Sequence, residues 1–206
     1  MIKVLTIDRE YGSGAVEIAQ KLADRLGWKL WDQLLTDEVA RYLECESRHV
    51  ERHEERRDPL HYRIFKAFLR GSYEGSQITP HMKMADAENI RRVSEQIVRK
   101  IAAQGNAVIV GRGSAYYLRD EPECFHLFVY APFEEKVRRL RESGKSEEEA
   151  TQLVQTVDRD RADFIRQNFG IQFPARHFFH LMVNSTIGEP AAVQTVLDAL
   201  SAVQKS

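Results

Sequence analysis

The sequence is poor in cysteine, with only Cys45 and Cys124 among its 206 residues. The two form neither a CxxC pair nor a metal-ligand spacing, so we expect reduced thiols and no disulfide framework or zinc site. No apolar run approaches the roughly 20 residues that span a bilayer, and the residues MIKVLTI lack the pattern of a secretory signal. These absences predict a cytoplasmic protein that is not inserted in a membrane.

An excess of charge of one sign is also missing. Lys and Arg number 30 and Asp and Glu number 31, giving a formal net charge of -1, which argues against bulk attraction to nucleic acid. A chain of this length buries roughly 70% of its unfolded surface when it folds as one domain. With no internal repeats or low-complexity segments, we expect a single domain over residues 1–206.

Five short apolar runs are predicted to be strands, and helical patterns lie between them. The runs are nearly continuous, as in strands covered on both faces. They are residues 2–7, 28–31, 107–111, 125–130 and 180–184. Ile18, Leu22 and Leu26 recur at helical spacing before Gly27, another helix begins near Pro132, and a third closes the chain. This alternation predicts an α/β fold with a central parallel sheet and right-handed crossovers.

Two segments interrupt the alternation. Residues 36–104 read as a helical insertion at the edge or top of the sheet, and within it residues 61–73 combine basic and aromatic side chains. That stretch either stacks on a base or nucleic acid or packs as an amphipathic helix. Residues 146–170 form a second helical segment, in which Ser146 and Glu149 make a capping box.

The stretch LTIDREYGSGAVEIAQKLADRLGW, residues 5–28, places a glycine-spaced turn between a strand and a helix. A P-loop reads GxxxxGK[ST] in that position, and its amides, with those of the helix start, cradle phosphate. Gly12 and Gly14 would let the backbone approach an anion. Arg9, however, replaces the first glycine, Ala15 the lysine and Val16 the Mg-binding hydroxyl. The turn is therefore either a phosphate loop without its lysine or a purely structural connection.

Arginines are the candidates to replace the lost charge. Arg112 follows an apolar strand and a glycine, at the strand end where open α/β sheets bind ligands, and it either clamps a phosphate or forms a structural salt bridge. The arginines of residues 159–166 either contact phosphate or pair with neighbouring aspartates on a solvated helix. Asp8, Glu10 and Glu17 lie near the loop and would hold Mg through water or merely cap the turn. We assign no residue as a metal ligand.

Four segments in order resemble the cytidylate-kinase-like family of bacterial P-loop proteins. Residues 5–35 and 106–140 carry the resemblance most strongly, since the family loop typically reads REYGSGGREIA or REFGSGGREIA. Residues 146–170 look like the family's lid, and residues 180–200 like its last strand and helix. The resemblance implies a three-layer P-loop kinase fold with a central parallel sheet, an acceptor-side helical insertion (36–104) and an arginine-bearing helical lid (146–170).

The resemblance also implies site residues. The phosphate donor would lie on the loop, with Asp32 and Arg112 on the acceptor side and Arg112, Arg161 and Arg166 acting in catalysis. The donor-binding residues are Arg9, Gly12, Ser13, Gly14, Ala15 and Val16. Gly113 stands where true cytidylate kinases have the aspartate of their GRD segment, so the resemblance does not support specificity for CMP.

The leading hypothesis is a nucleotide-binding phosphotransferase that moves the γ-phosphoryl group of ATP, with Mg, to a nucleoside monophosphate or similar small acceptor. Positioning and charge neutralisation would do most of the work. The alternative is a non-catalytic nucleotide-binding or assembly protein that kept the fold after losing the lysine. A third hypothesis, nucleic-acid binding by residues 61–73, is disfavoured by the net charge.

Overall fold

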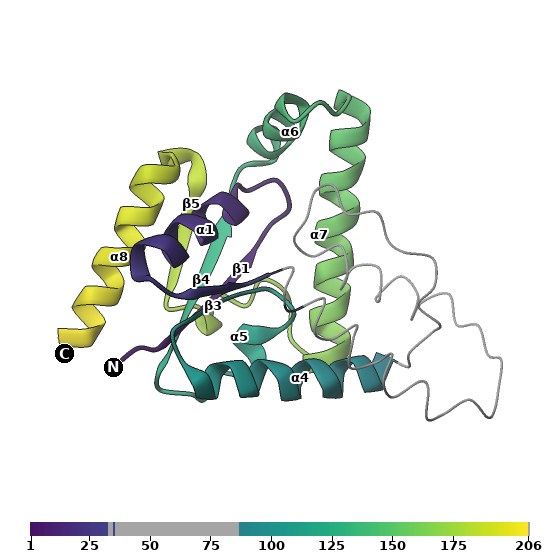
Figure 1. Ribbon diagram of the computed structural model, residues 1–206. Helices are drawn as coiled ribbons and strands as arrows, with labels where there is room; N and C mark the ends of the chain where they lie inside the picture. Colours follow the sequence, from purple (N-terminus) through teal and green to yellow (C-terminus); the bar gives the residue numbers. More distant parts are fainter. Residues whose placement is uncertain (33–34, 36–86, 206) are drawn as a thin grey trace, which may run out of the picture.

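The computed structural model describes residues 1–32, residue 35 and residues 87–205 (Figure 1). The predicted basic aromatic stretch at 61–73 and most of the predicted insertion at 36–104 lie outside the described residues. The strands are β1 (Val4–Arg9), β2 (Lys29–Trp31), β3 (Ala107–Val110), β4 (Cys124–Tyr130) and β5 (Leu181–Asn184). The α-helices are α1 (Ala15–Leu26), α4 (Ala87–Gln104), α5 (Ser114–Tyr117), α6 (Phe133–Glu142), α7 (Glu147–Phe169) and α8 (Glu189–Lys205).

The five strands form one parallel sheet in the order β2-β3-β1-β4-β5. β1 lies in the centre, with Val4 level with Ala107 of β3 and Cys124 of β4. The predicted strands and the parallel sheet are therefore confirmed. Because all strands run the same way, their carboxyl ends meet at one edge, and the turn between β1 and α1 lies at that edge.

Alternate residues of the buried strands point into two separate cores. Helices α1 and α8 cover one face, where Leu5, Ile7 and Val108 pack with Ile18, Leu22, Val193 and Val196. The other face is covered by α4, α5 and the end of α7, where Val4 and Ile109 pack with Val93, Val98, Tyr116 and Phe164. Figure 1 shows these helices on opposite sides of the sheet. Three layers, helix on sheet on helix, result from the period-two pattern of the strands.

The α6 and α7 helices stand above the sheet edge that carries the β1–α1 turn. Ser146 is the N-cap of α7 and accepts a hydrogen bond from the Glu149 amide at 3.1 Å, as the predicted cap requires. The first half of α7 packs with α6 and Tyr11 in a small apolar cluster, whereas Phe164 and Ile165 enter the main core. Among the described helices, none is long and apolar enough to cross a membrane.

Candidate functional site

The turn between β1 and α1 exposes a row of backbone donors. Gly12 and Gly14 both have φ of +74°, and Gly14 begins α1 without a side-chain cap. In the part of the chain that the structure describes, the amides of Gly12, Gly14, Ala15 and Val16 donate to no protein acceptor. The first bond of the helix runs from the Ile18 amide to the Gly14 carbonyl, at 3.3 Å. Neighbouring free amides at a helix start form an anion site.

Ala15 cannot supply a charge to this site. Its side chain is 3% exposed and packs in the core between the sheet and α1, with Ile18 and Ala19. Val16, the position of the missing hydroxyl, is half-buried. The loop therefore keeps the backbone amides of a phosphate site and lacks the lysine and hydroxyl side chains that a P-loop has at positions 15 and 16.

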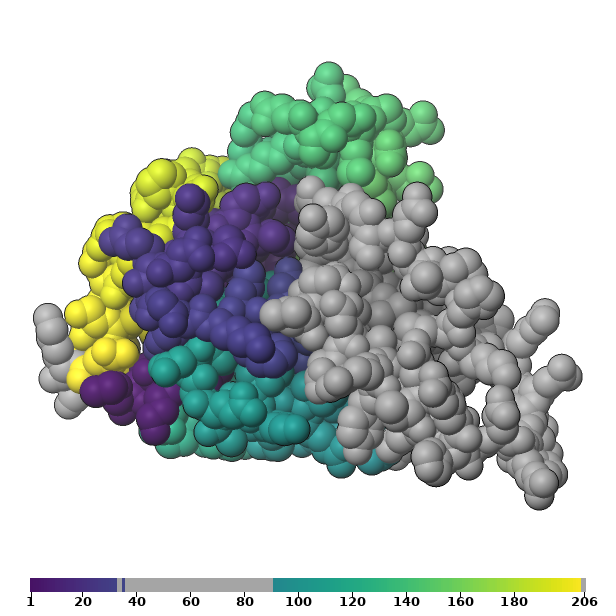
Figure 2. All heavy atoms as spheres, viewed as in Figure 1, coloured from purple at the N-terminus to yellow at the C-terminus, as the bar shows by residue number. Residues whose placement is uncertain are grey.

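Helix α6 lies directly against the loop. A Cβ at Gly12 would lie 3.1 Å from the carbonyl oxygen of Lys136, and a Cβ at Gly14 would lie 3.0 Å from Nη1 of Arg139. Glycine suits both positions because of the positive φ, and a side chain at either would make a tight contact with α6. Figure 2 shows α6 and the start of α7 above the N-terminal segment that carries the loop.

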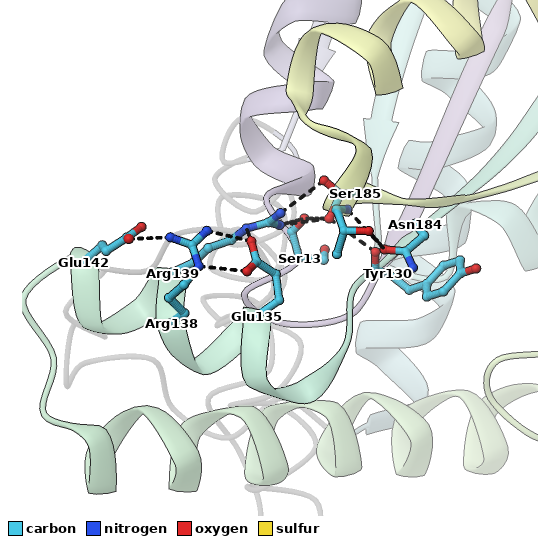
Figure 3. Close-up of polar contacts among 9 residues, drawn as sticks. Ser13, Tyr130, Glu135, Arg138, Arg139, Glu142, Asn184 and Ser185 are labelled. Carbon is cyan, nitrogen blue, oxygen red and sulfur yellow. Dashed lines mark hydrogen bonds and ion pairs between the residues drawn. The ribbon is translucent and has the colours of Figure 1, made fainter.

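Arg139 ties the loop to the turn after β5, as Figure 3 shows. Its Nη1 donates to the Ser13 carbonyl at 2.6 Å and to Ser185 Oγ at 2.8 Å, and its Nη2 donates to the Ser185 carbonyl at 3.1 Å. Ser185 Oγ in turn donates to the Ser13 carbonyl at 2.6 Å, and Glu135 accepts from Arg139 Nε at 2.8 Å. These bonds hold the loop in place in the absence of any ligand.

Lys136 forms a second link, between α6, the loop and α7. Its Nζ lies 2.9 Å from Glu10 Oε2 and 2.9 Å from Asp158 Oδ2, and the side chain is 8% exposed. Asp158 Oδ1 also accepts from the Tyr11 amide at 2.7 Å. Burial alone would lower the pKa of Lys136, but the charges of Asp158 and Glu10 outweigh it and raise the pKa. The ammonium therefore stays charged beside the loop.

The carboxyl ends of three neighbouring strands bring together five buried charged residues, which we call the edge cluster: Asp8, Arg9, Asp32, Arg112 and Arg161. Asp8 and Arg9 end β1, Asp32 follows β2, and Arg112 follows β3 after one glycine. These four are 5–7% exposed. Arg161 reaches them from α7 and donates to the Arg9 carbonyl at 3.1 Å.

Burial dominates the electrostatics of the edge cluster. It lowers the pKa of Arg9 to about 9, with repulsion from Arg161 acting in the same direction. It lowers the pKa of Arg112 to about 10, against the attraction of Asp32. For Asp8 and Asp32 burial raises the pKa, against the attraction of Arg9. Among the described residues the cluster holds three cations and two carboxylates, an excess of positive charge that suits an anionic ligand.

Arg112 is held in an unusual backbone conformation. Its φ is +59°, between Gly111 at +66° and Gly113 at +73°. A left-handed conformation costs a non-glycine residue roughly 1–2 kcal/mol, and such strain concentrates at functional sites. Both glycines are packed, because a Cβ at Gly111 would lie 2.0 Å from Arg9 Nη1 and one at Gly113 would lie 2.7 Å from Phe169 Cζ. The turn thus aims Arg112 into the edge cluster at a cost to the backbone.

The predicted site residues divide into two groups. Arg9, Asp32, Arg112 and Arg161 lie together in the edge cluster, and residues 12–16 form the adjacent loop. Arg166 does not join them in the structure, since its side chain is 69% exposed and pairs with Asp163 at 2.5 Å. Sequence reasoning did not single out Lys136 or Arg139. Their spacing of three residues on the helix after β4, next to the predicted ligand edge, is the signal that could have found them.

One carboxylate has the environment that a divalent cation would use. Asp8 is 6% exposed, and no described residue forms a hydrogen bond with its Oδ2. Within the described ranges no cluster of three or more His, Cys, Asp or Glu side chains could hold a metal by itself. Mg²⁺ commonly takes one or two protein carboxylates and completes its shell with phosphate oxygens and water. Asp8 therefore fits a Mg²⁺ ion that arrives with a polyphosphate.

A five-stranded parallel sheet between helices, with a glycine loop from the central strand to α1, defines the class of P-loop kinases. The sequence profile of the cytidylate kinase-like family matches residues 4–187. The chain therefore belongs to the cytidylate kinase-like family, as the sequence predicted. A comparison with curated protein sequences gave no match.

Solved structures with the same fold share little sequence. An uncharacterised protein from Eubacterium ventriosum ATCC 27560 is 18% identical, with a TM-score of 0.69 over 98% of this chain and 99% of the other. Shikimate kinase from Acinetobacter baumannii, solved with shikimate, is 11% identical, with a TM-score of 0.53 over 100% and 97%. Shikimate kinase from Bacteroides thetaiotaomicron is 14% identical, with a TM-score of 0.51 over 98% and 99%. At these identities the likeness concerns the fold alone.

Proposed function

We propose that the protein is a phosphotransferase that moves the γ-phosphoryl group of ATP to a small acceptor such as a nucleoside monophosphate. The observation that carries this proposal is the row of free amides at Gly12, Gly14, Ala15 and Val16 beside an arginine-rich edge cluster. Membership of the cytidylate kinase-like family supports it. Phosphoryl transfer needs little covalent chemistry from the protein, so positioned donors and cations suffice.

Each part of the site has a role in this proposal. The loop amides bind the donor phosphates, and Arg112 and Arg161 neutralise charge on the transferred group and the acceptor. Asp32 orients the acceptor at the end of β2. Asp8 would help to hold Mg²⁺, which would supply positive charge to offset that of the donor phosphates. Arg166 remains a predicted catalytic residue that would have to move to reach the site.

The acceptor is the open part of this proposal. Two proteins with the same fold are shikimate kinases, one of them solved with shikimate, so a non-nucleotide acceptor belongs among the candidates. The glycine at position 113 gives no reason to prefer CMP over other nucleoside monophosphates. We therefore define the acceptor by its chemistry, as a small molecule with an anionic group for Arg112.

A second candidate function is nucleotide binding without transfer. Ala15 favours this second candidate, because its buried methyl group supplies no positive charge to the loop. The loop amides alone contribute roughly 0.3–1 kcal/mol, and at most about 2, to the binding of an anion. Since about 1.4 kcal/mol is tenfold in affinity, the amides alone would bind ATP weakly. A catalytic site on this chain therefore needs a side-chain cation near the loop.

The test is a transfer assay with purified protein, γ-labelled ATP, Mg²⁺ and a panel of nucleoside monophosphates and shikimate. We expect transfer to one class of acceptor and a loss of about 100-fold or more in Arg112→Ala. The control is Arg119→Ala, an arginine that is 57% exposed and pairs with Asp120 at 3.1 Å, which should leave transfer unchanged. ATP binding without transfer to any acceptor would reject the enzyme and support the second candidate.

A further inference from the structure

The cation that the loop lacks in sequence has several possible sources in space. Arg139 and Lys136 of α6, Arg9 of β1 and Arg161 of α7 all lie within the loop's surroundings. They differ in how their donors are used. A residue that replaces the P-loop lysine must keep its charge, lie beside the glycines and retain a donor for the ligand.

Three of the four cations are committed elsewhere. Arg139 donates from Nε to Glu135, from Nη1 to Ser13 and Ser185, and from Nη2 to the Ser185 carbonyl, so four of its five N–H donors already bind the protein. The Arg9 guanidinium packs on Gly111 in the edge cluster, away from the start of α1. Arg161 shares that cluster and bonds to the Arg9 carbonyl. Arg9 and Arg161 therefore belong to the edge cluster at the carboxyl ends of the strands.

Lys136 meets all three requirements. Its backbone and Cβ lie against Gly12, with distances of 3.1 Å and 3.2 Å from a Cβ built there to its carbonyl oxygen and its own Cβ. Its ammonium is buried next to Glu10, the residue before Tyr11 at the start of the glycine turn. An ammonium has three donors. Two of them are used by Glu10 and Asp158, and no described residue accepts the third.

We propose that Lys136 is the donor-site cation of this protein and that its ammonium contacts the phosphates of ATP seated on the loop, in place of a lysine at position 15. The inference rests on the proposed function, because it assumes that the loop binds a nucleotide. It places the missing charge on a different element, 121 positions further along the chain. Glu10 and Asp158 hold the ammonium at the rim of the loop until phosphate arrives.

The carboxylates of Glu10 and Asp158 lead to a testable consequence for phosphate binding. They keep Lys136 charged while it is buried, but their own negative charge also opposes an incoming phosphate. If Lys136 were purely structural, neutralising Glu10 would remove only general repulsion, and binding would tighten no more than in Glu17→Gln, which removes a carboxylate near Gly14. A ligand-binding ammonium would bind phosphate better, because one competing charge has gone.

The experiment is calorimetric titration with Mg-ATP, and separately with inorganic triphosphate, on five versions of the full chain. They are the wild type, Lys136→Met, Glu10→Gln, Glu17→Gln and Lys21→Met, the last an exposed lysine of α1 as the matched control. We expect Lys136→Met to weaken binding of both ligands about tenfold or more, which is about 1.4 kcal/mol, and Glu10→Gln to tighten it about twofold or more. Lys21→Met should match the wild type.

Each of the other outcomes bears either on the role of Lys136 or on the proposed function. Wild-type affinity in Lys136→Met, with wild-type binding intact, overturns the inference and leaves the proposed function standing. Weaker or unchanged binding in Glu10→Gln also overturns it, because Lys136 would then be only a structural partner. If circular dichroism shows that Lys136→Met does not fold, Glu10→Gln is compared with Glu17→Gln, and equal tightening in the two variants overturns the inference. If the wild type binds neither ligand, the proposed function fails first.

Discussion

At the scale of single residues, Arg112 has the environment that costs the folded protein most. It is a charged residue at 6% exposure and at a positive φ, in a turn where glycine precedes and follows it. A glycine at this position would remove the backbone strain. An arginine occupies a backbone position that penalises it, which is the pattern expected when the side chain binds a ligand.

This interpretation predicts different effects for two substitutions at position 112. Arg112→Ala and Arg112→Gly both remove the guanidinium, so both should abolish transfer. Only Arg112→Gly also relieves the left-handed strain, and we expect it to be about 1 kcal/mol more stable than Arg112→Ala in urea unfolding. Equal stability of the two variants would show that the backbone at Arg112 is not strained.

The residue scale also shows what the sequence could and could not reveal. Gly12 and Gly14 were predictable, because their chemistry follows from the local pattern of strand, turn and helix. For Lys136 and Arg139 only the position on the helix after β4 could be inferred from the sequence. Their contacts with Glu10 and Ser13, 126 residues away along the chain, could not. Arg161 and Arg166 are five residues apart, about 140° around a helix, so one face of α7 cannot present both to the loop.

At the scale of elements, α7 connects two parts of the molecule. Its first half packs with α6 above the loop, and its last turns enter the core beneath the sheet. Asp158 and Arg161, one turn apart, reach the loop from the middle of the helix. The sequence predicted this segment from its cap and apolar stripe. Its contacts with Tyr11 and Arg9 depend on how the chain folds back, which periodicity does not encode.

The attachment of α7 can be tested through Gly113. A methyl group there would lie 2.7 Å from Phe169 Cζ, at the end of α7, and φ is +73°. Gly27 is the matched control, because its φ is +65° and nothing lies within 4 Å of a Cβ. Both Gly→Ala changes strain the backbone, but only Gly113→Ala should also displace a packed ring, at an extra cost of about 1–3 kcal/mol.

The comparison is made by urea unfolding of both variants at the same pH. A Gly113→Ala variant no less stable than Gly27→Ala would mean that Phe169 does not pack against the Arg112 turn. In that case the C-terminal end of α7 would be anchored by Phe164 and Ile165 without Phe169.

At the scale of the whole molecule, the three layers place every candidate residue except Arg166 at one edge of the sheet. β1, β2 and β3 deliver the edge cluster, α1 begins at the loop, and α6 and α7 close over it. The fold class could be predicted from the sequence, since alternating strands and helices admit few arrangements. The closure of α6 over Gly12 could not, because it depends on long-range packing between helices.

Whole-molecule stability should depend on pH through His126, in the centre of the sheet. Its Nδ1 lies 2.7 Å from Thr6 Oγ1, and burial, with the nearby His180, lowers its pKa from 6.5 to about 4. As the pH falls below 6.5, His126 binds a proton in the unfolded chain but stays neutral in the folded chain until about pH 4. The contribution of His126 to the free energy of unfolding is therefore fully present above pH 6.5 and is lost as the pH decreases towards 4.

We expect the wild type to lose about 2 kcal/mol more stability than His126→Gln between pH 7.5 and pH 5.0 in urea unfolding. Taking the difference between the two proteins removes the contributions of other titrating groups, including Asp8 and Asp32. Identical pH profiles would show that His126 titrates alike in the folded and unfolded states.

The most direct test of the whole account is whether the loop seats a triphosphate without a lysine at position 15. Wild-type protein titrated with Mg-ATP should give a saturable heat, and at about 100 times the dissociation constant ATP should stabilise the fold by about 2.7 kcal/mol. No heat and no rise in the unfolding midpoint with millimolar ATP would contradict the account.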